Sequence, residues 1–234
     1  MKDGIYSFEK NATEGLIYGD AYTPRVDYIY NSNTTVQISK LWDGIIVPQE
    51  GLVFHASLTD LTTAETGQSL TSTLVVPAVI DGIHCAQFSS NSSRVTATID
   101  PINDYGTTSL WFRADNYSTE ALLVLSGNSY VEWNIYTRGN YISFGRGGDD
   151  LYPAEFSTNT WHHFVCTSNK GVVAIYLDGQ NVYSGTLDAS GGSNLQLSRS
   201  SEPYSGYLAN VRVYNRPLDI DEVTLLYNEL SPSV

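Results

Sequence analysis

Hydrophobic side chains occupy every second position in residues 173–177, where Val, Ile and Leu are separated by Ala and Tyr. Side chains that alternate in this way point to opposite faces of a β-strand. Asp178 and Gly179 follow this run, and a second extended run resumes at Val182. An Asp-Gly pair accommodates positive φ at both central positions of a type I′ turn. The pattern therefore predicts a β-hairpin with its turn at Asp178 and Gly179.

The same alternation predicts strands on both sides of this hairpin. Phe164 and Cys166 fall on one face of a preceding strand, and His163 and Val165 on the other. Near the C-terminus, residues 211–214 alternate again before a proline.

A short helix is predicted after this last strand. Asp219 suits the position that caps a helix N-terminus, and Glu222 three residues later completes a capping box. Apolar side chains then recur at helical spacing, which predicts a helix packed against a sheet. These side chains are Val223, Leu226, Tyr227 and Leu230.

Composition favours an all-β protein. The 234 residues include 17 Tyr and 19 Gly but only 16% charged residues, a usage that suits twisted antiparallel sheets. Turn-forming residues recur along the chain, as expected for a two-sheet antiparallel sandwich of about 200–250 residues. Such turns are expected at residues 81–82, 126–128, 138–140, 147–149 and 190–192.

Charge and cysteine content exclude several classes of protein. The formal net charge of −13 argues against a nucleic-acid partner, because phosphates require a basic surface. No apolar run approaches the length of a membrane span, so no membrane insertion is expected. Cys85 and Cys166 lie in apolar, alternating runs and are expected to be buried free thiols, although the sequence leaves a bridge between them open.

Six segments in this order resemble the laminin-G-like, concanavalin-A-like jelly-roll domains, and the resemblance covers about residues 51–230. The segments are residues 51–58, 81–88, 108–115, 161–167, 173–179 and 206–218. The resemblance implies a jelly-roll domain that binds glycans or proteins and performs no chemistry. It also implies that Trp111 and Trp161 are core residues.

Two parts of the chain are expected. Residues 1–48 fit the jelly-roll pattern poorly and are interpreted as an extended arm or small β attachment segment that contacts a protein partner. Residues 49–234 are expected to form the jelly-roll domain. A homo-oligomer is also compatible with this organisation.

The carboxylates do not suggest an enzyme. Retaining glycosidases need two carboxyl groups about 5–5.5 Å apart, which same-face positions on a strand provide. The dense carboxylate cluster of Asp219, Asp221 and Glu222 is explained by helix capping. We therefore expect a protein without catalytic residues.

Tyrosine-bearing segments are the candidate sugar site, because exposed aromatic faces stack on sugar rings. Tyr136 is expected on the open face of its strand, opposite Trp133. The alternative is that most of the 17 tyrosines are ordinary half-buried strand residues. The candidate ligand-binding residues are Tyr136, Tyr141, Tyr152, Tyr204, Asp149 and Asp150.

Calcium is the candidate cofactor, since oxygen-rich loops suit hard cations. The resemblance implies an acidic residue just before the last strand, but Ala209 and Asn210 stand there instead. Asp81, Asp149 and Asn210 are the candidate ligands. Apart from calcium, no cofactor is expected.

The composition, rich in Tyr, Asn, Ser and Thr, is typical of proteins that work outside cells, yet residues 1–5 show no signal peptide. Either a signal has been removed, or the protein leaves the cell on lysis, as a bacteriophage virion part does. We expect a non-enzymatic, glycan- or surface-binding lectin-like module of an extracellular particle, a phage tail or capsid decoration, attached through its N-terminal arm. Two alternatives stay open: a structural assembly protein without sugar binding, and a secreted bacterial polysaccharide-binding or glycoside-hydrolase-like protein.

Overall fold

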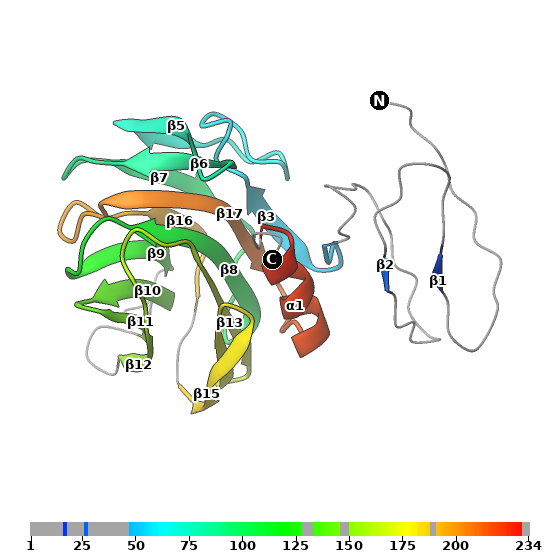
Figure 1. The fold of residues 1–234 in the computed structure, drawn as a ribbon. Helices are drawn as coiled ribbons and strands as arrows, with labels where there is room; N and C mark the ends of the chain where they lie inside the picture. The colour runs from blue at the N-terminus through cyan, green and yellow to red at the C-terminus, as the bar shows by residue number, and fades with distance from the viewer. Residues whose placement is uncertain are drawn as a thin grey trace.

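The computed structural model describes residues 16–17, 26–27, 47–127, 133–145, 150–187 and 191–230. In this part of the chain two antiparallel sheets face each other, and one helix lies outside them (Figure 1). The predicted all-β, two-sheet sandwich with one short C-terminal helix is confirmed. Two parts of the expected arm are among the described residues. One is a short antiparallel pair of strands, β1 (Leu16–Ile17) and β2 (Val26–Asp27), and the other is the end of the arm at residues 47–48.

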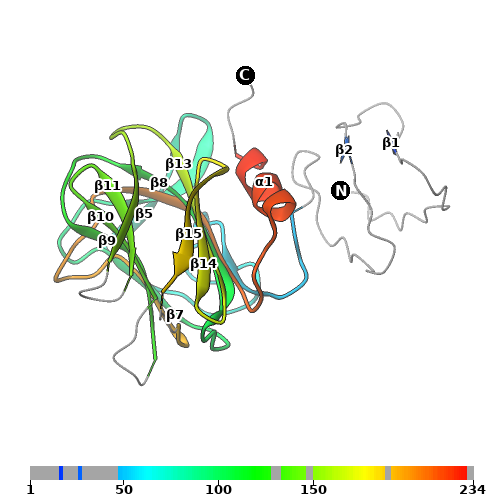
Figure 2. The same cartoon turned by 90° about the horizontal axis from the view of Figure 1, so that it is seen from below.

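One sheet has seven strands. Its curved layer faces the second sheet across the core (Figure 2). In spatial order the strands are β12 (Leu151–Glu155), β11 (Tyr141–Gly145), β10 (Trp133–Arg138), β9 (Glu120–Ser126), β16 (Asn194–Leu197), β7 (Arg94–Thr98) and β4 (Thr71–Thr73).

The other sheet has eight strands. β3 (Leu52–Ala56) pairs with one end of β17, beside the stretch of β17 that pairs with β6. The remaining strands in spatial order are β15 (Gln180–Thr186), β14 (Val172–Leu177), β13 (His162–Asn169), β8 (Tyr105–Ala114), β17 (Gly206–Tyr214), β6 (Ile83–Phe88) and β5 (Val75–Ile80).

The predicted hairpin is formed by β14 and β15. Asp178 and Gly179 have φ values of 52° and 74°, as a type I′ turn requires. Gly179 also lies close to helix α1 (Ile220–Asn228), because a β-carbon there would stand 3.0 Å from the Tyr227 ring. The turn residue therefore matters both for the hairpin and for the packing of the helix.

The core between the sheets consists of aromatic and aliphatic side chains. Phe164 and Cys166 face it from β13, whereas Val165 packs with other residues on the outer side of the sheet, as the alternation predicted. Cys85 and Cys166 are both buried and free, which confirms the expected thiols. No helix of the described residues is long and apolar enough to cross a membrane.

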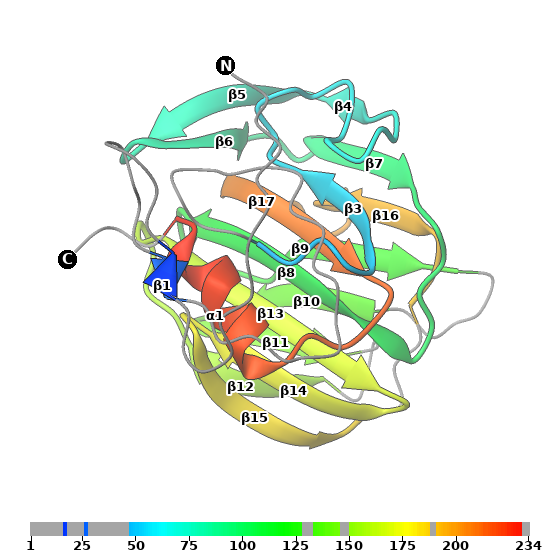
Figure 3. The same cartoon turned by 90° about the vertical axis from the view of Figure 1, so that its right-hand side faces the viewer.

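Helix α1 covers the outer face of the eight-stranded sheet (Figure 3). The capping box is present: the Asp219 carboxylate accepts the Glu222 N–H, and the Glu222 side chain accepts the Asp219 N–H. Val223 and Leu226 are buried against the sheet, in contact with a cluster that includes Tyr176. Burial of this apolar stripe fixes the helix on the sheet.

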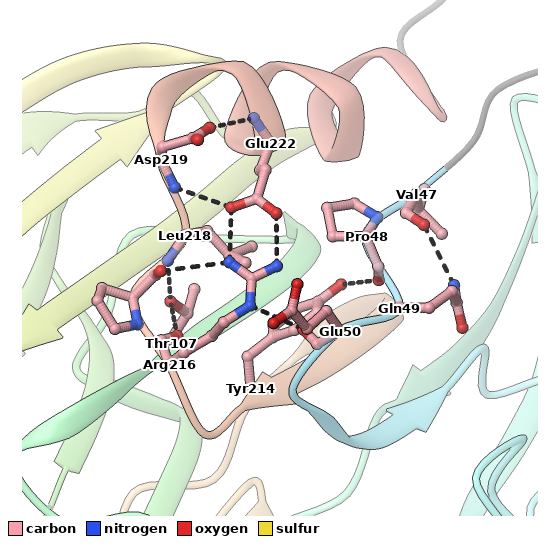
Figure 4. A network of polar contacts seen from close by, with 11 residues as sticks. Val47, Pro48, Gln49, Glu50, Thr107, Tyr214, Arg216, Leu218, Asp219 and Glu222 are labelled. Carbon is pink, nitrogen blue, oxygen red and sulfur yellow. Dashed lines mark hydrogen bonds and ion pairs between the residues drawn. The ribbon is translucent and has the colours of Figure 1, made fainter. Parts of the chain in front are cut away.

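Residues 47–50 are fastened to the end of β17 and to α1 (Figure 4). The Tyr214 hydroxyl donates to the Pro48 carbonyl at 3.2 Å, and Arg216 Nε donates to the Glu50 carbonyl at 2.9 Å. The Arg216 guanidinium also pairs with Glu222 on the helix, 2.7 Å between Nη1 and Oε2. These contacts give residues 47–50 a defined position on the sandwich.

Candidate functional site

Tyr136 is buried, with 3% of its surface exposed, so its predicted place on an open face is wrong. The alternation itself is correct, because Trp133 faces the core and Tyr136 the outer side. On that outer side the Arg138 guanidinium lies over the tyrosine ring, 4.8 Å from its centroid, and Arg199 Nη1 donates to its hydroxyl at 3.1 Å. Arg138 and Arg199 thus cover the Tyr136 side chain, which the alternation of the sequence had predicted to be open to solvent.

Tyr204 is also buried, with 1% exposed, and cannot offer an open ring face to a sugar. Its ring packs near Phe88, with 6.0 Å between centroids. Its hydroxyl donates to the Tyr207 carbonyl at 3.2 Å, and burial raises its pKa well above the ordinary value. Tyr204 is therefore a buried packing residue in the loop before β17.

Tyr141 and Tyr152 do lie together on the surface, as exposed side chains on neighbouring strands β11 and β12. Their rings meet edge to face with 6.3 Å between centroids. A hydrogen bond to Glu155 raises the pKa of Tyr141. This pair is the part of the predicted tyrosine platform that the structure leaves accessible.

Asp150 is held by Arg138, with 3.3 Å between Oδ2 and Nη2. Arg138 also lies 3.6 Å from the Glu202 carboxylate, so one guanidinium joins two carboxylates beside Tyr136. Asp149 lies outside the described residues. The other candidate calcium ligands have different partners: Asp81 pairs with Arg113 at 3.7 Å, and the Asn210 side-chain oxygen lies 3.4 Å from His55 Nε2.

Among the described residues, no group of three or more His, Cys, Asp or Glu side chains is placed to hold a metal. Asn210 itself has a φ of 44° and lies in the irregular stretch of β17, where its register against β8 shifts. Calcium binding stays a prediction.

A polar pocket of about 370 Å³ opens at one end of the sandwich. We call it the rim pocket. Three segments form it: the β6–β7 turn, the β8–β9 loop with the start of β9, and the segment before β17. Its lining residues are Ser89, Ser90, Asn91, Asn116, Ser118, Thr119, Glu120, Pro203, Tyr204 and Ser205.

Glu120 is the buried polar centre of the rim pocket, with 4% of its surface exposed. Its carboxylate accepts hydrogen bonds from the Ser118 hydroxyl at 2.6 Å, the Ser205 N–H at 3.2 Å and the Asn116 amide at 3.4 Å. Burial raises the pKa of Glu120, and these donors oppose that shift. Because the donors come from two loops, the carboxylate ties both sides of the pocket together.

Sequence reasoning predicted Tyr204 but missed the other residues of the rim pocket. The run of serines and asparagine at 89–93 has the composition of an ordinary turn. A usable signal was present at Glu120, a single carboxylate at the start of the apolar run 121–125. A charge in such a run must be buried with partners or exposed at a strand end, and only the fold shows which.

His162 lies between Ser157 and Asp178 in an arrangement that has the composition of a catalytic triad. Its Nδ1 lies 2.7 Å from the Asp178 carboxylate, and its Nε2 lies 3.1 Å from the Ser157 hydroxyl. The same Nε2 also lies 3.1 Å from both the main-chain nitrogen and the carbonyl oxygen of Ser157, so this ring nitrogen is shared among three polar groups of one residue. Asp178 Oδ1 accepts the His163 N–H at 2.8 Å. We interpret the group as a link between a loop and the β14–β15 turn.

The fold is similar to those of several solved binding domains. Domain 4 of AbnA, an extracellular arabinanase from Geobacillus stearothermophilus solved with arabinotriose, superposes with a TM-score of 0.61 and 17% identity, over 75% of this chain and 98% of that domain. The receptor-binding domain of botulinum neurotoxin type G gives a TM-score of 0.63 and 16% identity, over 76% of this chain and 51% of that one. A structure of botulinum neurotoxin type C, whose cell entry is described as dependent upon interaction with two ganglioside molecules, gives a TM-score of 0.60 and 14% identity, over 78% of this chain and 52% of that one.

At these identities the likeness shows the fold alone, and the chain spans about half the length of the toxin domains. No curated protein matches the chain in sequence. The family model described as the concanavalin A-like lectin/glucanases superfamily matches residues 89–224, more than half of the chain. These residues include most strands of both sheets, the β14–β15 hairpin and the capped start of α1. The two-sheet sandwich, its helix and this match together show that the chain belongs to the concanavalin A-like lectin/glucanase superfamily.

Proposed function

We propose that this chain is a non-enzymatic glycan-binding module and that the rim pocket is its ligand site. The observation that carries the proposal is the lining of the pocket, where hydroxyl and amide side chains converge around Glu120. A sugar presents hydroxyl groups that donate and accept hydrogen bonds, and such a wall can pair with them. A volume of about 370 Å³ is in the range of small-ligand sites.

Several features support a binding role over catalysis. Both oxygens of Glu120 accept hydrogen bonds from the protein, which suits a carboxylate that shapes a wall. The arabinanase domain was solved with arabinotriose, and the type C toxin is described with gangliosides, so relatives of this fold bind glycans.

The test is binding of the full chain to a glycan array, followed by calorimetry on any glycan that is retained. Asn91→Trp places an indole at the mouth of the pocket from an exposed turn, and we expect it to abolish binding. Ser184→Trp, at an exposed position of β15, is the matched control and should bind as the wild type does. Equal binding by both variants would locate the glycan elsewhere, and the Tyr141–Tyr152 pair would become the next site to test.

We further propose that residues 1–48 attach this module to an extracellular particle, a bacteriophage virion. The composition is typical of proteins that work outside cells. The hydrogen bonds that hold residues 48 and 50 against Tyr214 and Arg216 give the preceding segment a defined starting position on the sandwich. A shortened chain that begins at Val47 keeps these contacts. If the arm is an attachment device, the shortened chain is a folded monomer, whereas the full chain oligomerises or docks on its particle.

A further inference from the structure

The rim pocket contains carboxylate but no cation. Among its lining residues, all of which the structure describes, none is Lys, Arg or His. A second carboxylate lies next to it, because the Ser205 hydroxyl donates to Asp115 at 3.2 Å while the Ser205 N–H donates to Glu120. Asp115 raises the pKa of Glu120 further, as one negative charge near another does.

Two arginines in neighbouring parts of the fold, Arg113 and Arg138, are engaged elsewhere. Arg138 pairs with Asp150 and Glu202, on the outer side of the seven-stranded sheet. Arg113 pairs with Asp81, and its guanidinium lies 5.6 Å from the centroid of the Tyr207 ring. Neither Arg113 nor Arg138 can place its guanidinium in the pocket without breaking its ion pair.

A pocket of this kind discriminates by charge. A sugar carboxylate placed in it would meet like charges and find no guanidinium to pair with. A neutral sugar can donate its hydroxyls to the carboxylate and amide oxygens, and an ammonium group is attracted to Asp115 and Glu120. We propose that the rim pocket selects uncharged or amine-bearing sugars and rejects uronic and sialic acids. This inference rests on the proposed function and names the class of glycan.

Glu120 is the residue that sets this preference. Its oxygens already accept hydrogen bonds from Ser118, Ser205 and Asn116, which leaves little acceptor capacity for a sugar hydroxyl, so the charge is the larger part of its effect on a ligand. Glu120→Gln keeps the size of the side chain and one acceptor oxygen while removing the charge. The variant should therefore alter discrimination more than it alters the shape of the pocket.

The experiment uses oligosaccharides of glucose, glucosamine and glucuronic acid of equal length, which share ring stereochemistry and differ in charge. We expect the full chain to bind the first two at least about tenfold more tightly than the third. In Glu120→Gln that ratio should fall, with a gain for the glucuronate. Asp100→Asn, which removes one negative charge at an exposed position before β8, should leave the ratio unchanged.

The other outcomes separate the two proposals. If the full chain binds the glucuronate as well as the neutral oligosaccharide and Asn91→Trp abolishes both, the pocket binds glycans but the charge preference is overturned. The charge preference is also overturned if Glu120→Gln and Asp100→Asn change the affinity ratio equally. The net charge of the protein would then explain the ratio without a specific role for Glu120. If none of the three oligosaccharides and no glycan of the array is retained, the proposed function itself fails and the inference with it.

Discussion

The outer face of the eight-stranded sheet and the rim pocket use buried charge in opposite ways. Under α1, Arg212 and Glu229 form an ion pair with 1% and 4% of their side chains exposed. At the rim, the Glu120 carboxylate is nearly as buried but is held by hydroxyl, amide and main-chain donors. The first arrangement neutralises its charge inside the protein, whereas the second leaves a negative charge facing a cavity.

The packing around the two sites differs as well. Beneath the helix, Trp111 stacks on His163 at 5.0 Å and on Tyr227 at 5.7 Å between centroids, and the side chains of Trp111 and His163 are buried. The rim is lined by turns with exposed serine and asparagine side chains. We therefore expect substitutions under the helix to lower the free energy of unfolding more than substitutions at the rim do.

The largest expected effect is the loss of the ion pair under the helix. Glu229→Ala leaves the Arg212 guanidinium buried without its counter-charge, and we expect the free energy of unfolding to fall by about 3–5 kcal/mol. Asp81→Ala breaks a pair in which the carboxylate is 65% exposed, and should cost about 1 kcal/mol or less. Urea unfolding of both variants measures the difference. Equal losses of unfolding free energy in the two variants would mean that the buried ion pair under the helix contributes no more to stability than an exposed one.

A pH effect of intermediate size is expected from His163. Burial, and secondly the nearby Arg212, lower its pKa to about 3. Since the unfolded chain has the ordinary value of about 6.5, it binds a proton that the folded chain does not as the pH falls below 6.5. The free energy of unfolding therefore falls by about 1.4 kcal/mol per pH unit between pH 6.5 and 3, and this contribution is constant above pH 6.5.

His163→Phe removes this term and keeps an aromatic ring against Trp111. Between pH 7 and pH 5 the wild type should lose about 2 kcal/mol more than the variant. His84→Ala, at an exposed histidine, controls for loss of an imidazole and should follow the wild type. Parallel losses in all three proteins would show that His163 is not buried in its neutral form.

The smallest effect is expected at the rim. Asn116 is exposed, and its hydrogen bond to Glu120 is long at 3.4 Å. We expect Asn116→Ala to change the free energy of unfolding by no more than about 0.5 kcal/mol. Urea unfolding beside Glu229→Ala makes the comparison direct. A loss close to that of Glu229→Ala would make the rim a part of the scaffold and would count against its role as a separate ligand site.

Most of the fold could be predicted because its signals are local. The turn at Asp178 and Gly179 depends on which residues tolerate positive φ, and the capping box at Asp219 depends on two side chains three residues apart. The alternation that put Trp133 inside and Tyr136 outside was also correct. Each of these features is decided within a few residues of the chain.

The candidate site was predicted only in part because exposure is not a local property. Tyr136 points outward as expected, yet Arg138 and an arginine from another part of the chain cover it. Tyr204 lines the rim pocket but is buried, and does not offer the open ring that the sequence predicted. Tyr141 and Tyr152 are exposed on β11 and β12, and β12 is the edge of the sheet, so no further described strand pairs with it.

The strands, the hairpin turn and the capped helix follow from the sequence alone, because hydrophobic alternation and turn chemistry act between neighbours in the chain. Tertiary structure alone decided which outward-facing side chains meet solvent and that Ser89, Asn116, Glu120 and Ser205 line one pocket. These residues are separated by up to about half of the chain, and they converge only because the order of strands in the two sheets brings three loops to the same end of the sandwich.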